Sequence, residues 1–139
     1  IKGVDIILHA GDINKDYVIY ELEEIARVEY VLGNTDNEDD WLSPNRKKLI
    51  SVHGCNIGIV HGHGDGGTTL QRVQKAFAGE NVSCVVFGHS HIPMNEVIDN
   101  VLYFNPGSPT DKRRQEKFSY GILTVDDGGV AGEIIYFDK

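Results

Sequence analysis

Five short polar clusters, each following an apolar run, hold the residues of this sequence that could do chemistry. They are "HAGD" (9–12), "GNTD" (33–36), "HGHG" (61–64), "GHSH" (88–91) and "NPGS" (105–108). Carboxylates, amide oxygens and imidazoles can bind divalent metals, and the glycines beside them allow sharp turns and close approach of the backbone to an ion. Because burying each polar cluster costs desolvation energy, their repetition favours one shared site over separate structural roles.

The candidate ligands in these clusters form a mixed nitrogen and oxygen set. They are Asp12, Asn34, His61, His89 and His91. With no thiolate among them, the set suits Mn, Fe, Ni, Co or Zn used in catalysis rather than a structural zinc. If Asp12 bridges, two ions could lie roughly 3.5–4 Å apart and acidify a shared water for in-line attack on phosphorus.

Other polar residues have simpler interpretations. His9 falls inside a predicted strand and His53 opens a turn, so we expect both to be structural. His63 flanks His61 and could support it or contact a substrate. Asp39 and Asp40 are most simply explained as a solvated loop face.

The elements that must position these clusters follow from apolar periodicity and turn residues. The sequence predicts strands over 4–11, 29–37 and 83–88, a loop over 37–48, and hairpins over 48–64, 95–108 and 119–137, of which the second turns at Asp99-Asn100. It also predicts two helices. The helix over 16–28 has Val18, Leu22, Ile25 and Ala26 at helical spacing opposite an acidic face, and the helix over 68–79 is capped by Thr68 or Thr69. Strand and helix alternate in the front half, and hairpins dominate the back half. We therefore expect an α/β domain with layered, mixed sheets, in which ligands bind at the carboxyl ends of strands.

Composition narrows the range of functions. The 139 residues carry a net charge of −8, which fits a single domain and makes a nucleic-acid polymer an improbable partner, although a small phosphorylated substrate is compatible. Cys55 and Cys84 lack C-x-x-C spacing, which predicts two reduced thiols in a cytoplasmic protein. The absence of an 18-residue apolar run argues against a membrane span.

The ordered clusters resemble the calcineurin-like metallophosphoesterase superfamily, and most closely its small single-domain phosphodiesterase branch of bacteria and archaea. The resemblance implies a β-sandwich flanked by helices (α-β-β-α) and two divalent metal ions, with Mn favoured. It also implies phosphodiester hydrolysis by a metal-bridging hydroxide, with Asp12 bridging both ions. Three residues would complete one metal and carry catalysis with Asp12, namely Asn34, His61 and His89. His91 would serve the other metal.

Two features depart from the family pattern. The family's Asp-x-His motif on a first strand has no counterpart after Ile1, so we expect an upstream segment that carries it. Without that segment, we expect the chain to hold one metal well and the other poorly. Thr35 stands where many members have a histidine that protonates the leaving group. In this chain water, Asp36 or His63 could supply that proton, or the substrate could have a good leaving group that needs none.

A basic stretch, "NPGSPTDKRR" (105–114), stands out in this acidic chain. We expect Arg113 or Arg114 to bind a substrate phosphate together with Asn34 and His63, and Lys112 to be solvated. A non-catalytic scaffold, like the retromer subunit of this fold, is the alternative function. An oligomer is possible, and the hairpin near Met94 or the Tyr136-Phe137 end could pair between subunits.

Overall fold

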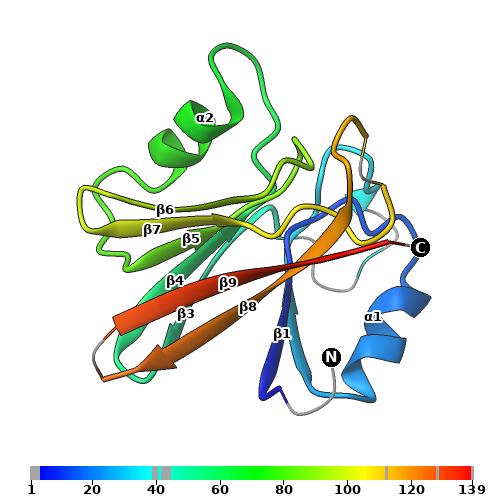
Figure 1. The fold of residues 1–139 in the computed structure, drawn as a ribbon, viewed down its shortest axis with the longest axis horizontal. Helices are drawn as coiled ribbons and strands as arrows, with labels where there is room; N and C mark the ends of the chain where they lie inside the picture. Colours follow the sequence, from blue (N-terminus) through cyan, green and yellow to red (C-terminus); the bar gives the residue numbers. More distant parts are fainter. Residues whose placement is uncertain (1–3, 39–40, 42–44, 112, 128, 139) are drawn as a thin grey trace.

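The computed structural model describes residues 4–38, 41, 45–111, 113–127 and 129–138. Its largest element is a five-stranded mixed sheet of order β3-β4-β5-β7-β6 (Figure 1). The strands are β3 (Lys47–Val52), β4 (Cys55–Val60), β5 (Cys84–Val86), β6 (Met94–Ile98) and β7 (Val101–Asn105). Strands β4, β5 and β7 run parallel, whereas β3 and β6 are antiparallel to their neighbours.

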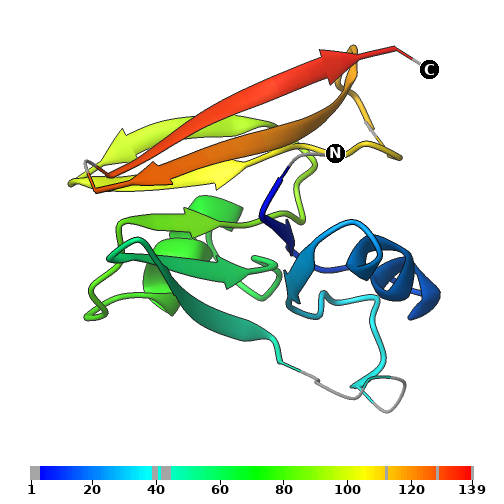
Figure 2. The same ribbon diagram turned by 90° about the horizontal axis from the view of Figure 1, so that it is seen from below.

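The two faces of this sheet are covered differently. Helix α2 (Thr69–Ala76) packs on one face, through a cluster made of Val73, Phe77, Val85, Phe87 and Tyr103. The other face meets two ladders of two strands each, β1-β2 and β8-β9. Their strands are β1 (Ile6–His9), β2 (Arg27–Tyr30), β8 (Phe118–Asp126) and β9 (Gly129–Phe137). Figure 2 shows the β8-β9 hairpin as a long ribbon along one side of the large sheet. The layered α/β architecture expected from the sequence is confirmed.

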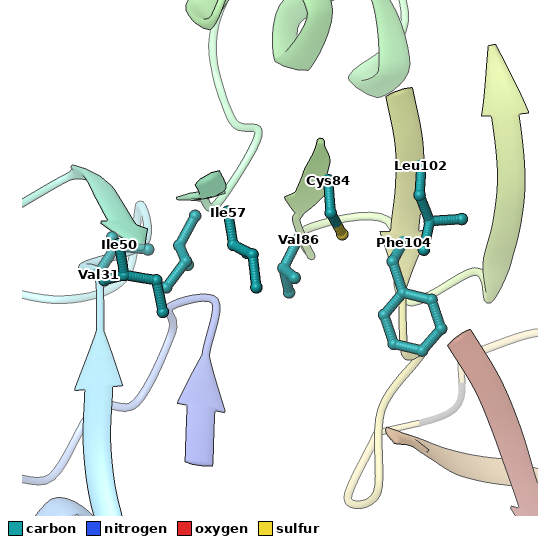
Figure 3. Packing of buried hydrophobic residues seen from close by; sticks show 8 residues of the cluster. Val31, Ile50, Ile57, Cys84, Val86, Leu102 and Phe104 are labelled. Atoms are coloured by element: carbon teal, nitrogen blue, oxygen red, sulfur yellow. The ribbon is translucent and has the colours of Figure 1, made fainter. Parts of the chain in front are cut away.

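The main core lies between these layers. Figure 3 shows its side chains pointing away from α2, toward β1, β2 and the β8-β9 hairpin. The buried residues are Val31, Ile50, Ile57, Ile59, Cys84, Val86, Leu102 and Phe104. Alternate residues of β5 therefore face opposite clusters, with Cys84 and Val86 in this core and Val85 under α2. Neither cysteine is in a disulfide, and burial raises the pKa of Cys84 to about 12.

Close backbone approach fixes the β8-β9 hairpin on the large sheet. A Cβ on Gly121 would overlap the Phe104 ring, and one on Gly132 would lie 2.6 Å from Phe104 Cε1. The carbonyl of Gly132 also accepts a hydrogen bond from Asn95 Nδ2 at 2.8 Å. Only glycine leaves room for the aromatic ring at these two positions.

Turn and cap residues behave as predicted. Asp99 and Asn100, with φ of 51° and 66°, turn the β6-β7 hairpin in the left-handed region that two-residue turns favour. Thr68 caps α2, because its hydroxyl accepts from Gln71 N at 3.1 Å and Gln71 Oε1 accepts from Thr68 N at 2.9 Å. No helix within the described ranges combines the length and apolarity that a membrane span needs.

The predicted boundaries were wrong at the first helix and second strand. Helix α1 spans Tyr17–Glu23 instead of 16–28, and β2 begins already at Arg27. Ile25, which the helical spacing placed on the buried face, is 43% exposed, and Val28 instead pairs with Ile7 of β1. Parallel pairing with β1 therefore prevails over helical periodicity. The predicted loop over 37–48 ends at β3, and Asp39 and Asp40 lie outside the described residues.

Candidate metal centre

Four of the five predicted ligands meet beyond the carboxyl ends of the strands. Asp12 and Asn34 follow β1 and the extended segment after β2, and His61 and His89 follow β4 and β5. The Nε2 atom of His61 lies 3.1 Å from Asp12 Oδ2 and 3.0 Å from Asn34 Oδ1. The Nδ1 atom of His89 lies 3.3 Å from the same nitrogen. We call these four residues the donor cluster.

The hydrogen bonding of His61 determines what the cluster can bind. Its Nδ1 lies 2.7 Å from the carbonyl oxygen of Ala10, which can only accept, so Nδ1 carries a proton. In the neutral ring, Nε2 then presents a lone pair toward the oxygens of Asp12 and Asn34. Acceptor atoms that face one another call for a cation between them, and histidines that bind metals commonly donate their second N–H to a carbonyl in this way.

The distances agree with this chemistry. Metal–ligand bonds of about 2.1 Å place neighbouring ligands roughly 3.0–3.4 Å apart, as the donor atoms here already are. Within the described residues, however, no group of three or more His, Cys, Asp and Glu side chains is already arranged as a metal site. The donor cluster includes the amide of Asn34, which is not one of these residue types. Its side chains also contact one another directly, and a bound ion would take the place of those contacts.

Burial and hydrogen bonds set the charge states around the cluster. Burial by itself would raise the pKa of Asp12, but hydrogen bonds from Thr35 and the nearby imidazoles keep it below its usual value. The Thr35 N–H donates to Asp12 Oδ1 at 3.0 Å. Burial lowers the pKa of His89, and His61 and Arg72 lower it further. An ionised carboxylate and a neutral imidazole are the forms that bind divalent metals.

Two glycines let the strand ends approach closely enough to form the cluster. A Cβ on Gly33 would lie 2.5 Å from the backbone nitrogen of Asp12 and would overlap its carboxylate. A Cβ on Gly11 would lie 2.7 Å from Gly33 N and 2.9 Å from His61 Nδ1. The glycines of "HAGD" and "GNTD" are therefore required by the contact between the two loops.

Substituting Gly33 with alanine tests this contact. We expect the added methyl group to displace the Asp12 carboxylate and to lower the affinity of the cluster for Mn²⁺ by about 10- to 100-fold, the range found when support of a metal ligand is lost. Gly54→Ala is the steric control, because nothing lies within 4 Å of a Cβ there, although its φ of 79° carries some strain. Calorimetric titration of the two variants with Mn²⁺ provides the comparison, and equal affinities would contradict this role for Gly33.

The side chain of Asp36 joins the loop after β1 to the loop after β2, a contact that the sequence did not reveal. It is 5% exposed, and its Oδ2 accepts from Ile13 N at 3.1 Å and Gly33 N at 2.9 Å. Its Oδ1 accepts from Asn14 N at 2.6 Å. Both carboxylate oxygens thus accept hydrogen bonds from backbone of the loops that carry Asp12 and Asn34. This geometry suits a positioning residue better than the general acid that we considered for Asp36.

Two arginines hold the neighbouring loops, and sequence reasoning missed both. Arg46 donates from Nη1 to Gly33 O at 2.8 Å and from Nη2 to Asp36 O at 3.2 Å. Arg72 donates from Nε to Gly62 O at 2.9 Å and from Nη1 to Gly67 O at 2.9 Å. The only sequence signal was a charged residue near each polar cluster, which is too common to be informative.

The remaining histidines differ in their surroundings. The ring of His63 lies 5.5 Å from that of His61, and its buried Nδ1 has no hydrogen-bond partner among the described residues. Burial lowers its pKa. His9 Nδ1 accepts from Gly11 N at 3.2 Å, as expected for a structural role, and burial lowers its pKa as well. His53 is exposed in the β3-β4 turn with φ of 47°.

His91 and the arginines of the basic stretch lie beside the donor cluster rather than in it. His91 Nδ1 donates to the carbonyl of Asp111 at 2.7 Å, which leaves Nε2 with its lone pair. Arg113 and Arg114 line a small recess with Ser90, the residue between His89 and His91. Lys112 lies outside the described residues. The structure thus places the predicted phosphate-binding side chains next to the "GHSH" loop.

The layered fold and the position of this cluster define a protein of the metallophosphoesterase type. The family model for the calcineurin-like phosphoesterase superfamily domain matches residues 1–128. The chain therefore belongs to the calcineurin-like phosphoesterase superfamily, as the sequence motifs suggested.

Relatives of known sequence carry related names. A probable metallophosphoesterase of Methanothermobacter thermautotrophicus is 33% identical over 136 residues, which cover 96% of this chain and 77% of that protein. A probable metallophosphoesterase of Methanocaldococcus jannaschii is 32% identical, covering 91% of this chain and 64% of that protein. The phosphodiesterase YfcE of Escherichia coli is 29% identical, covering 78% of this chain and 59% of that protein.

Solved structures share the fold. A structure described as a novel archaeal phosphodiesterase superposes with a TM-score of 0.74 at 24% identity, covering 95% of this chain and 84% of that one. Vps29 of Entamoeba histolytica complexed with zinc superposes with a TM-score of 0.71 at 22% identity, covering 97% and 83%. These two likenesses establish the architecture.

Proposed function

We propose that this chain is a metal-dependent phosphoesterase that hydrolyses phosphodiesters. The observation that carries the proposal is the donor cluster. In it, potential metal-binding atoms of Asp12, Asn34 and His89 lie 3.0–3.3 Å from Nε2 of His61. The hydrogen bond from His61 Nδ1 to the carbonyl of Ala10 orients that nitrogen. The names of the phosphodiesterase relatives favour diesters over monoesters. The proposed cofactors are two divalent ions, with Mn²⁺ favoured, and the zinc complex of the Vps29 relative indicates that this fold accommodates such ions.

Each residue of the cluster has a defined part in this proposal. Asp12, Asn34, His61 and His89 would hold one ion, and Asp12 would also serve the other ion together with Nε2 of His91. When bound, the ions would polarise a phosphoryl oxygen and make a water more acidic. Thr35 holds the carboxylate of Asp12 in place through its N–H. Asn34 and His63 would face the substrate. The Nδ1 of His63, which has no hydrogen-bond partner in the described part of the chain, would be available to a phosphoryl or leaving-group oxygen.

Removal of metal tests the proposal. We expect EDTA followed by desalting to lower hydrolysis of bis(p-nitrophenyl) phosphate by at least about 100-fold, because the ions supply several kcal/mol of transition-state stabilisation. Adding Mn²⁺ should restore the rate, and adding Mg²⁺ should restore it less well, because imidazole ligands suit Mn²⁺ better than Mg²⁺. A rate unaffected by EDTA in the purified protein would refute a metal-dependent reaction.

The basic recess gives a second prediction, on substrate binding. Substituting both Arg113 and Arg114 with alanine should raise KM about tenfold or more while changing kcat little, because a charge-assisted hydrogen bond is worth about 1.5–3 kcal/mol. Lys117→Ala is a matched control, since that exposed lysine does not line the recess and pairs with Asp138 at 3.4 Å. An unchanged KM in the double variant would show that the two arginines are merely solvated.

The Vps29 structures make a non-catalytic scaffold the second candidate. That function would not require the acceptor atoms of Asp12, Asn34 and His61 to face one another. The enzyme is favoured because these costly groups are all present and in contact. A protein that bound metal but hydrolysed no phosphodiester at any metal concentration would favour the scaffold.

A further inference from the structure

Two recesses flank the "GHSH" loop, and Ser90 and Ile92 line both of them. The larger has a volume of about 370 Å³ and the smaller about 170 Å³. The smaller is completed by Arg113, Arg114 and Gln115. The larger lies between this loop and the start of α2, and its other lining residues are Thr68, Thr69, Leu70, Phe87, Pro93, Met94 and Glu96.

Hydrogen bonds fix the backbone around Ser90, which separates the two recesses. His89 and His91, on either side of Ser90, adopt φ of 68° and 61°. Ser90 Oγ accepts from Asn105 Nδ2 and from Ile92 N, both at 3.2 Å, and Asn105 Nδ2 also donates to Gly88 O at 3.1 Å. Because both bonds use the Ser90 oxygen as acceptor, its own proton is available to a ligand oxygen. Both recesses therefore border Ser90, the residue that directly follows His89 of the donor cluster.

The two recesses suit opposite chemistries. Arginine side chains line the smaller one, which favours an anionic oxygen. The larger one is mainly apolar, and Glu96 is the one ionisable side chain among its lining residues. Its volume falls within the range of small-molecule sites and admits an aromatic ring. Burial of such a ring is favourable, whereas Glu96 disfavours a second negative charge there.

We propose that the larger recess binds an uncharged aromatic substituent of the phosphoester. The preferred substrate class is then an asymmetric diester that places a neutral aromatic group against Leu70 and Ile92 and its anionic portion against the arginines. This inference rests on the proposed function, because it takes the donor cluster as the place where the phosphoryl group binds.

Phosphonates separate the recess from the phosphoryl site, because they bind without being hydrolysed. Calorimetry of the full protein loaded with Mn²⁺ would compare methylphosphonate, phenylphosphonate and 4-carboxyphenylphosphonate. We expect phenylphosphonate to bind about tenfold more tightly than methylphosphonate through burial of the ring. We expect the carboxylate to remove most of that gain.

Charge reversal at Glu96 gives the discriminating variant. Glu96 is exposed on strand β6, so Glu96→Lys should fold normally, and it should improve binding of 4-carboxyphenylphosphonate about tenfold while leaving methylphosphonate unchanged. Glu133→Lys on β9 makes the same change of charge at an exposed position that does not line the recess, and should change none of the three affinities.

The outcomes distinguish the two proposals. Equal affinity for methyl- and phenylphosphonate would overturn the aromatic subsite and leave the proposed function standing. A Glu96→Lys variant with unchanged preference would also overturn it. If none of the phosphonates bound the metal-loaded protein, the phosphoryl site itself would be wrong, and the subsite would fall with it.

Discussion

Replacing His61 with alanine is expected to lower kcat/KM for bis(p-nitrophenyl) phosphate about a thousandfold, which corresponds to roughly 4 kcal/mol. His61 is 2% exposed and its Nε2 contacts the other three members of the donor cluster. In the proposed site its loss would remove one metal ligand, and it would leave the Asp12 carboxylate without the imidazole that lies 3.1 Å from it. Steady-state kinetics at saturating Mn²⁺ would measure the effect.

A matched histidine provides the control. His53 is exposed in the β3-β4 turn, at the opposite end of β4 from His61, and asparagine tolerates its φ of 47°. We therefore expect His53→Asn to retain full activity. A His61→Ala variant that kept more than about a tenth of the wild-type rate while folded would be incompatible with a metal ligand at this position.

Asp36→Ala is expected to have the largest effect on stability, lowering the free energy of unfolding by about 3 kcal/mol or more. The variant would leave three backbone N–H groups, those of Ile13, Asn14 and Gly33, without their acceptor. The bonds from Ile13 and Gly33 are buried, and each buried orphan costs about 1–3 kcal/mol. Because Ile13 directly follows Asp12 and Gly33 directly precedes Asn34, activity should fall as well. Urea unfolding would measure the stability change.

An exposed aspartate provides the control for the buried Asp36. Asp65 is exposed in the loop before α2, so Asp65→Ala should change stability by less than about 0.5 kcal/mol. Asp36→Asn keeps one acceptor oxygen and should be intermediate. An Asp36→Ala protein as stable as Asp65→Ala would refute the role of Asp36 in joining the two loops.

The sequence predicted the elements whose signals are local. The Asp99-Asn100 turn, the Thr68 cap and the apolar strand over 83–88 each depend on neighbouring residues, and the structure confirms them. The position of the donor cluster was also predictable, because its residues follow strands whose carboxyl ends meet.

Contacts between distant segments were not predictable in the same way. Asp36 bonds to Ile13 and Asn14, which lie 23 and 22 residues away, and nothing in "GNTD" identifies those partners. Arg46 holds Gly33 from 13 residues away, and its side chain looked like part of a charged loop. The early end of α1 likewise depends on β2 pairing with β1, a long-range contact that helical spacing cannot reveal.

Metal content is the most direct test of the central claim that the donor cluster binds a divalent ion. Elemental analysis after loading with Mn²⁺ and gel filtration would count the ions per chain in the wild type, His61→Ala and His53→Asn. We predict at least one tightly held ion in the wild type and in His53→Asn, and loss of that ion in His61→Ala. Equal metal content in all three proteins, or none in the wild type, would contradict the assignment of this cluster as a metal centre.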